Sequence, residues 1–172
     1  MIDLKKVIRQ INDFPKKGIL FYDITTLLNS PEYLTETINQ MAEKIINIDF
    51  DLIVCPESRG FILGMPLAYK LKKGFVPARK PGKLPYVTSI RNYALEYGNN
   101  SIEIHIDAIK PNQKVIIVDD LLATGGTCKA LAELIEEIGG KIAGIEFLIE
   151  LKNLGGREIL NKYQNIISIL EY

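Results

Sequence analysis

The chain has 172 residues, of which 47% are hydrophobic and 24% are charged, and its 21 Lys and Arg residues balance its 21 Asp and Glu residues. This length and composition describe one compact domain, residues 1–172, with a substantial core. The zero formal charge argues against binding to nucleic acid, because proteins that bind the phosphate backbone usually carry a clear basic excess.

The chain also lacks the marks of secretion and membrane insertion. No apolar segment approaches the roughly 18 uninterrupted residues of a membrane span, and residues 1–12 contain no long apolar stretch of the kind found in signal peptides. Cys55 and Cys128 stand alone, without the paired spacing of a zinc site or the density of a disulfide framework. We therefore expect a cytoplasmic protein without a membrane partner.

The N-terminal part of the chain predicts two helices. Asp3 can cap a short amphipathic helix with apolar residues at positions 4, 7, 8 and 11, before Pro15 and Gly18 interrupt the pattern. Ser30 followed by Pro31 is typical of a helix start, and apolar residues at positions 34, 38, 41 and 45 mark one face of a four-turn helix.

Short apolar runs then alternate with segments of helical period, at residues 52–55, 61–71, 74–78, 114–119, 127–138 and 142–151. This alternation predicts an α/β fold, in which helices flank a mostly parallel, twisted sheet. Gly139 and Gly140 predict a left-handed end to one helix. Residues 79–98 show no helical period, so we expect a long loop there, and such loops are usually functional or mobile.

The segment from Val115 to Thr127 carries the strongest chemical pattern. A buried strand is followed by two carboxylates, Asp119 and Asp120, and then by a glycine-containing loop and a helix start. In an open parallel sheet this loop lies at the carboxyl end of the strand, where ligands bind. Backbone N–H groups and the helix N-terminus suit a phosphate, whereas paired carboxylates suit a vicinal diol or a hydrated divalent cation. The predicted ligand is a phosphorylated sugar.

This run resembles the signature of the type I phosphoribosyltransferases, which bind 5-phosphoribosyl-1-pyrophosphate. Other stretches are similar to the adenine-specific members of that family, and the matches extend from about residue 13 to residue 172. They are Gly18–Phe21, Glu57–Phe61, Arg79–Lys80, Gly82–Pro85, Leu95–Gly98 and Gly156–Glu158. The resemblance implies the type I fold, with a small N-terminal hood over about residues 1–33 and a long mobile loop, about 79–98, that closes over the site.

The resemblance also implies roles for individual residues. Asp119 and Asp120 would hold the ribose hydroxyls, and Glu96 would act as the general acid/base on the purine. Arg59 is a second catalytic candidate. The 5-phosphate would bind to Ala123, Thr124, Gly125, Gly126 and Thr127. The pyrophosphate would bind to Glu57, Ser58, Arg59, Arg79, Lys80 and Lys83, whose cations can stabilise the charge that develops on it. Adenine would bind to Leu20 and Phe21, the aromatic ring of which would stack on the base.

The implied cofactor is Mg²⁺, held mainly through the sugar pyrophosphate, with Asp119 or Asp120 as indirect ligands; the sequence assigns no metal ligand of its own. The implied assembly is a homodimer. Two positions depart from the family pattern, because Tyr22 stands where arginine is frequent and Pro56 stands where glycine is frequent. His105, the single histidine, is assigned no role.

The sequence thus predicts transfer of a phosphoribosyl group to adenine, giving AMP and pyrophosphate in purine salvage. Two alternatives remain open. One is a salvage enzyme for an oxopurine such as xanthine, which would use the same sugar-phosphate site. The other is a regulator that binds the sugar phosphate and controls nucleic acid, although the chain has neither a basic surface nor an added helix-turn-helix.

Overall fold

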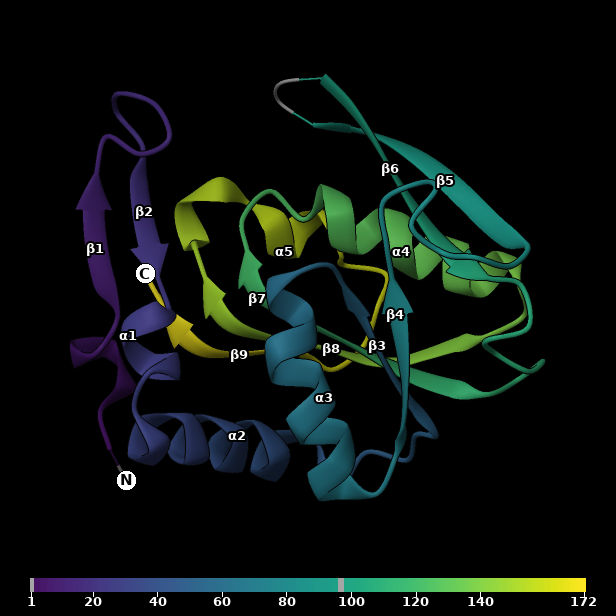
Figure 1. The fold of residues 1–172 in the computed structure, drawn as a ribbon, viewed down its shortest axis with the longest axis horizontal. Helices are drawn as coiled ribbons and strands as arrows, with labels where there is room; N and C mark the ends of the chain where they lie inside the picture. The colour runs from purple at the N-terminus through teal and green to yellow at the C-terminus, as the bar shows by residue number, and fades with distance from the viewer. Residues whose placement is uncertain (1, 96–97) are drawn as a thin grey trace.

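The computed structural model describes residues 2–95 and 98–172. Its centre is a sheet of five parallel strands in the order β4-β3-β7-β8-β9 (Figure 1). The strands are β3 (Leu52–Pro56), β4 (Gly74–Ala78), β7 (Lys114–Leu122), β8 (Lys141–Glu150) and β9 (Ile166–Glu171). The predicted α/β fold with a mostly parallel sheet is therefore confirmed. From β3 the chain continues to β4 on one side of the sheet, whereas from β7 it continues to β8 and β9 on the other side. The carboxyl ends of β3 and β7 therefore form the switch point where ligands bind in such sheets.

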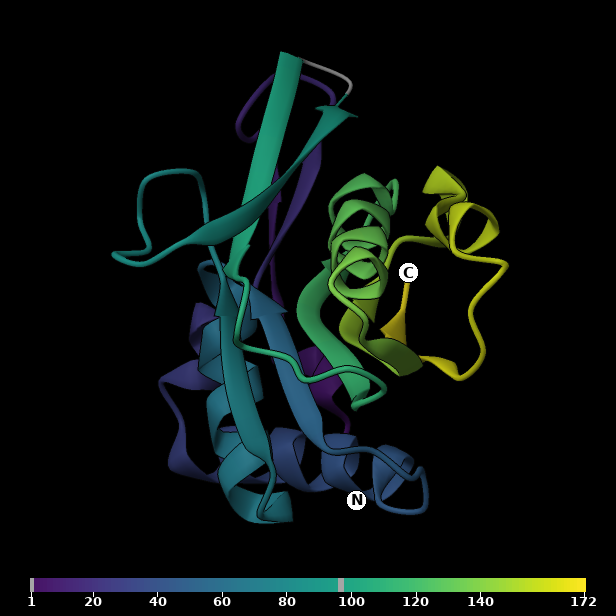
Figure 2. The ribbon, with the colours of Figure 1, turned by 90° about the vertical axis from the view of Figure 1, so that its right-hand side faces the viewer.

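Alternate residues of the strands build two cores. In β7, Ile116 and Val118 face α2 (Pro31–Ile45) and α3 (Arg59–Leu71), whereas Val115 and Ile117 pack with α4 (Gly126–Glu137). The helices therefore cover both faces of the sheet, as the view in Figure 2 shows. Continuous apolar strands are typical of parallel sheets that are buried on both sides.

Two antiparallel hairpins flank the carboxyl edge of the sheet. The first pairs β1 (Arg9–Asn12) with β2 (Leu20–Asp23), and the short helix α1 (Thr25–Leu28) follows it. The second pairs β5 (Thr88–Leu95) with β6 (Gly98–His105). In Figure 1 they stand on either side of the loop between β7 and α4.

Several predicted elements are confirmed in detail. Ser30 caps α2, since its hydroxyl accepts a hydrogen bond from the backbone N–H of Tyr33 at 3.4 Å, and Pro31 is the first helical residue. Gly139 follows α4 with a φ of +92°, the left-handed conformation predicted for it. Within the described residues, no helix has the length and apolar character needed to cross a membrane.

Three boundaries predicted from the sequence were wrong. The helix predicted after Asp3 is a single 3-10 turn, Leu4–Lys6, because residues 9–12 pair with β2 instead. The predicted loop at 79–98 is irregular only to residue 87, since residues 88–95 form β5 against β6. The strand predicted at 114–119 continues to Leu122 and contains both acids. In the two hairpins, pairing with a partner strand overrides the local pattern.

Candidate functional site

The carboxyl edge of the sheet brings two of the predicted segments into contact. Arg59, the first residue of α3, donates from Nε to Asp120 Oδ2 of β7 at 2.8 Å. The next residue, Gly60, permits this approach, because a Cβ there would stand 3.1 Å from both Asp119 Oδ1 and the Val118 carbonyl oxygen. The end of β3 and the acids of β7 therefore form one polar cluster.

Burial governs the ionisation of the two acids. Asp120 is 6% exposed, and its backbone N–H donates to Asp119 Oδ1 at 2.9 Å. Burial raises the pKa of Asp119, and the negative charge of Asp120 raises it further. Burial also raises the pKa of Asp120, although the positive charge of Arg59 opposes that shift. The pair is thus a carboxylate site that depends on neighbouring cations or hydrogen-bond donors.

The glycine-containing loop has the geometry predicted for an anion site. Gly125 adopts a φ of +80° immediately before α4, a conformation that costs glycine little. The loop 123–127 therefore turns directly into the N-terminus of a twelve-residue helix, where free N–H groups and the helix dipole favour an anion. Thr127 Oγ1 lies 3.4 Å from Tyr93 Oη of β5, which links the loop to the second hairpin.

The segment predicted to bind pyrophosphate is held by internal pairing. Glu57 accepts from Arg79 Nε at 3.1 Å, from Arg79 Nη2 at 2.9 Å and from the Lys80 N–H at 2.5 Å. Burial favours the neutral acid, but these hydrogen bonds and the charge of Arg79 hold the pKa of Glu57 below its ordinary value. The structure therefore joins three of the predicted pyrophosphate residues, Glu57, Arg79 and Lys80, to one another. Ser58 lies exposed between Glu57 and Arg59.

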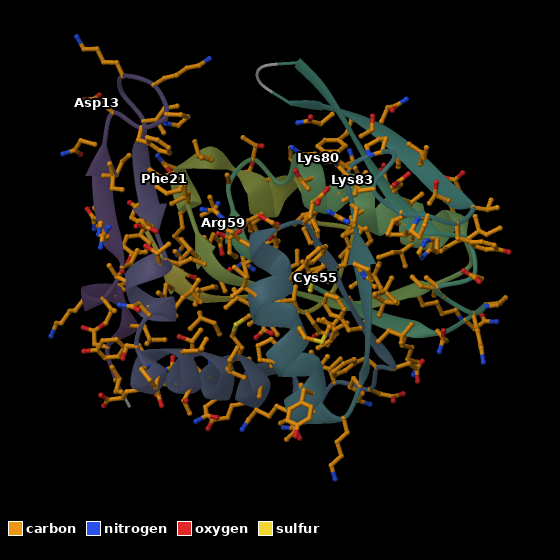
Figure 3. The ribbon with its side chains drawn as sticks, in the orientation of Figure 1. Asp13, Phe21, Cys55, Arg59, Lys80 and Lys83 are labelled. Atoms are coloured by element: carbon orange, nitrogen blue, oxygen red, sulfur yellow. The ribbon has the colours of Figure 1, made fainter. Side chains whose placement is uncertain are left out.

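Lys80 and Lys83 lie on the loop that follows β4 and are found, like Arg59, in the upper half of the view in Figure 3. The loop is anchored by Glu103 of β6, which is 2% exposed. Its carboxylate accepts from the N–H groups of Lys83 and Leu84 and from Thr88 Oγ1, each at 3.1 Å. The role of Glu103 was not predicted. A glutamate in a strand of alternating polar and apolar residues does not indicate from the sequence which loop it will contact.

A cleft of about 940 Å³ opens between the first hairpin and the β7–α4 loop. Leu20 and Phe21 line it from β2, and Ala123 and Thr124 line it from the loop. The Arg59 guanidinium lies 5.3 Å from the centre of the Phe21 ring, and the two side chains point toward one another (Figure 3). The predicted base-binding residues Leu20 and Phe21, Arg59, and the predicted phosphate loop (residues 123–127) therefore converge.

Sequence reasoning missed four apolar residues of this cleft, namely Leu121, Leu151, Leu154 and Tyr172. Leu121 directly follows the acid pair, but an apolar residue in an apolar strand has no distinguishing signal. Tyr172 is the last residue of the chain, and its ring lies 4.2 Å from the ring of Tyr22. Tyr22, which departs from the family pattern, thus packs in an aromatic pair beside the cleft.

Glu96 lies outside the described residues. His105 is partly exposed and its ring lies 6.1 Å from that of Tyr86, so the structure gives it no place in the cleft. Cys55 and Cys128 are free and buried, and burial raises the pKa of both thiols. In the part of the chain that the structure describes, no group of three or more His, Cys, Asp or Glu residues could hold a metal ion.

Comparison with known proteins agrees with this geometry. A family model for the phosphoribosyl transferase domain matches residues 23–170, which include all but the last residue of the sheet, the acid pair and the loop 123–127. The fold and the signature within it therefore define a phosphoribosyltransferase.

Individual relatives narrow the class. The adenine phosphoribosyltransferase of Thermosipho africanus is 56% identical over 169 residues, which cover 98% of this chain and 99% of the relative. The crystal structure of adenine phosphoribosyltransferase from Thermoanaerobacter pseudethanolicus superposes with a TM-score of 0.96, at 52% identity, over 99% of this chain and 98% of the other. The chain belongs to the adenine phosphoribosyltransferase family.

A relative solved with ligands extends the comparison. The enzyme from Saccharomyces cerevisiae, complexed with adenine and D-2,5-dideoxy-2,5-imino-altritol 1,6-bisphosphate, is 38% identical, with a TM-score of 0.91 over 98% of this chain and 97% of the other.

Proposed function

We propose that this protein transfers the 5-phosphoribosyl group of 5-phosphoribosyl-1-pyrophosphate to adenine, giving AMP and pyrophosphate in purine salvage. The observation that carries the proposal is that a single cleft is lined both by Leu20 and Phe21 and by Ala123 and Thr124 of the phosphate loop. A nucleoside monophosphate needs such a site, with a flat apolar slot for its base and hydrogen-bond donors for its phosphate.

In the proposed reaction, each group of site residues contacts a different part of the substrates. Loop 123–127 holds the 5-phosphate, and Asp119 and Asp120 accept hydrogen bonds from the ribose hydroxyls. The bond from ribose C1′ to the pyrophosphate oxygen breaks while a purine ring nitrogen bonds to C1′, and Glu96 takes the purine proton. Arg59, Lys80 and Lys83 stabilise the charge on the departing pyrophosphate. The Glu57–Arg79 pair holds the segment that presents them.

The donor set around the acids fits Mg²⁺ bound through the substrate. Asp119 and Asp120 offer two carboxylates, and Mg²⁺ commonly uses one or two carboxylates together with substrate phosphate oxygens and water. In this proposal the ion lies on the sugar pyrophosphate, with Asp119 or Asp120 as indirect ligands. When bound, it would supply neutralisation of the pyrophosphate charge.

We further propose that the protein is a cytoplasmic homodimer. Three large apolar residues, Ile62, Met65 and Tyr69, recur along one face of α3 and are 43%, 52% and 87% exposed. An exposed apolar stripe of this kind is typical of an interface, and a second copy of the chain would cover it. Sedimentation of the wild type at twice the monomer mass, and of Met65→Lys at the monomer mass, is the expected result. The proposed cytoplasmic location is supported separately by Cys55 and Cys128, because two buried free thiols suit a reducing compartment.

The test of the activity is Mg²⁺-dependent consumption of 5-phosphoribosyl-1-pyrophosphate with adenine, hypoxanthine, guanine or xanthine supplied separately, following both nucleotide and pyrophosphate. Turnover with adenine alone is expected. Turnover with an oxopurine instead would refute the assignment of Leu20 and Phe21, although the sugar-phosphate site would stand. Binding of the sugar phosphate without any turnover, together with sequence-selective binding of nucleic acid, would favour a regulator.

A further inference from the structure

The motif Gly156-Arg157-Glu158 has no part in the proposed chemistry, yet it lies directly against the phosphate loop. Gly156 begins the short helix α5 (Gly156–Ile159) and is buried. A Cβ on Gly156 would stand 2.2 Å from the Ala123 carbonyl oxygen, and a Cβ on Gly125 would stand 2.8 Å from the Gly156 carbonyl oxygen. The two backbones thus touch with no side chain between them. The position of the loop is therefore tied to the position of α5.

Arg157 fixes α5 to the sheet. Its Nε donates to Glu150 Oε1 at 2.9 Å, its Nη2 donates to Glu150 Oε2, and its Nη1 donates to the Ile166 carbonyl oxygen at 2.8 Å. Glu150 is the last residue of β8 and is 3% exposed. Ser168 of β9 donates to the same carboxylate at 2.6 Å. The planar guanidinium therefore binds one buried carboxylate with two parallel bonds and joins α5 to two strands.

A second connection runs through the strand ends. Next to Glu150, the Leu151 N–H donates to the Leu122 carbonyl oxygen at 2.9 Å, one residue before the phosphate loop begins. Movement of the Glu150–Arg157 pair would thus be transmitted to the loop both through Leu122 and through Gly156. Each route consists of backbone contacts, which have little freedom to adapt.

We infer that Arg157 is a positioning residue for the phosphate loop: its guanidinium holds Gly156 against Ala123 and Gly125, and so sets the loop geometry that binds the 5-phosphate. This inference rests on the proposed function. It assigns to the Gly156-Arg157-Glu158 motif a role in binding the sugar phosphate and none in binding the base, which the proposed function places against Leu20 and Phe21.

The experiment compares Arg157→Lys and Gly156→Ala with a matched control, Gly140→Ala. Lysine keeps the charge but loses the two parallel hydrogen bonds. The control introduces a similarly close contact, with its Cβ 2.7 Å from Ile135 Cγ2. Gly140 immediately precedes β8 and therefore lies at the amino end of the strand, away from the loop. Measured quantities are KM for 5-phosphoribosyl-1-pyrophosphate, KM for adenine, kcat, thermal stability, and calorimetric affinities for AMP and adenosine.

Both Arg157→Lys and Gly156→Ala are expected to raise KM for the sugar pyrophosphate by about 10- to 10²-fold, because a misplacement of about 1 Å can cost an enzyme up to about 10²-fold. KM for adenine should not change, and the preference for AMP over adenosine should fall by a similar factor. Gly140→Ala should lose stability without any change in either KM. If Arg157→Lys does not fold, Ser168→Ala carries the same test with a smaller expected shift. This variant removes only the hydroxyl that donates to Glu150 and accepts from Arg157 Nη2.

Two results would overturn the inference. The motif is merely structural if the variants lose stability while KM for the sugar pyrophosphate stays at the wild-type value. The effect is general destabilisation if Gly140→Ala raises that KM equally. Absence of turnover by the wild type with every base would instead refute the proposed function, and the ratio of AMP to adenosine affinity would still report on the loop.

Discussion

The buried side chain of Glu146 is predicted to make the stability of this protein fall steeply with rising pH. Glu146 lies in the middle of β8, between Val118 of β7 and Ile167 of β9. It is fully buried, and neither carboxylate oxygen has a hydrogen-bond partner among residues 2–95 and 98–172. Burial raises its pKa from 4.5 to about 9, although the positive charge of Lys44 opposes this shift.

The sign and size of the effect follow from proton linkage. Between pH 4.5 and pH 9 the folded state keeps a proton on Glu146 that the unfolded chain has lost, so the free energy of unfolding falls as pH rises. The loss is about 1.4 kcal/mol for each pH unit, which amounts to about 3 kcal/mol at pH 7 and about 6 kcal/mol at pH 9. The neutral carboxyl adds a cost of about 1–3 kcal/mol for its unmade hydrogen bonds.

Urea denaturation at a series of pH values from about 5 to 9 tests this reasoning on the wild type, Glu146→Met and Glu146→Gln. Methionine has a similar length and no polar atoms to satisfy, so Glu146→Met should be more stable than the wild type by about 3 kcal/mol or more at pH 7. Both variants should lose the contribution of this group to the pH slope. Glu43→Gln, an exposed change on α2, is the matched control and should keep the wild-type slope. A wild type equally stable at pH 6 and pH 8, or a Met variant with the wild-type slope, would refute the argument.

Three further predictions concern the site. Phe21→Ala should raise KM for adenine by about tenfold or more, because stacking of a base on an aromatic ring contributes about 1–3 kcal/mol, while KM for the sugar pyrophosphate should not change; steady-state kinetics with each substrate varied will decide. Lys83→Ala should lower turnover at subsaturating sugar pyrophosphate and leave thermal stability unaltered, and full turnover would show that this charge is only a solvated surface group. Glu103→Ala leaves three donors of the 79–88 segment without their acceptor, so urea denaturation should show a loss of about 1–3 kcal/mol, and an unchanged stability would contradict the anchoring role.

The sequence predicted the parts of this molecule whose signals are local. The acid pair, the glycines and the apolar strand before them lie within thirteen residues of one another, so the β7–α4 loop could be recognised without knowledge of anything else. The same holds for the cap at Ser30 and the stop at Gly139, because each depends on backbone conformation at one or two residues.

The parts that could not be predicted depend on partners distant in the chain. Residues 88–95 form a strand because β6 pairs with them. The strand β9 was not predicted, and it is a strand of the sheet because it pairs with β8. The contact between Gly156 and Ala123 joins residues more than thirty positions apart. No periodicity carries such information, since it arises from packing rather than from local preference.

The same distinction applies to the charged residues of the site. Their roles toward a pyrophosphate were implied by the family resemblance, and their pairing with one another was not predictable. Arg59 pairs with Asp120, and Arg79 pairs with Glu57 across 22 positions of the chain. A buried charge without a partner is costly, so these pairs stabilise the polar edge of the sheet. In the proposed function, a bound sugar pyrophosphate would replace this mutual contact, offering hydroxyl donors to Asp120 and negative charge to Arg59. We therefore expect the site to select a ligand that carries both a diol and an anion, because a ligand with only one of them would leave the other partner unsatisfied.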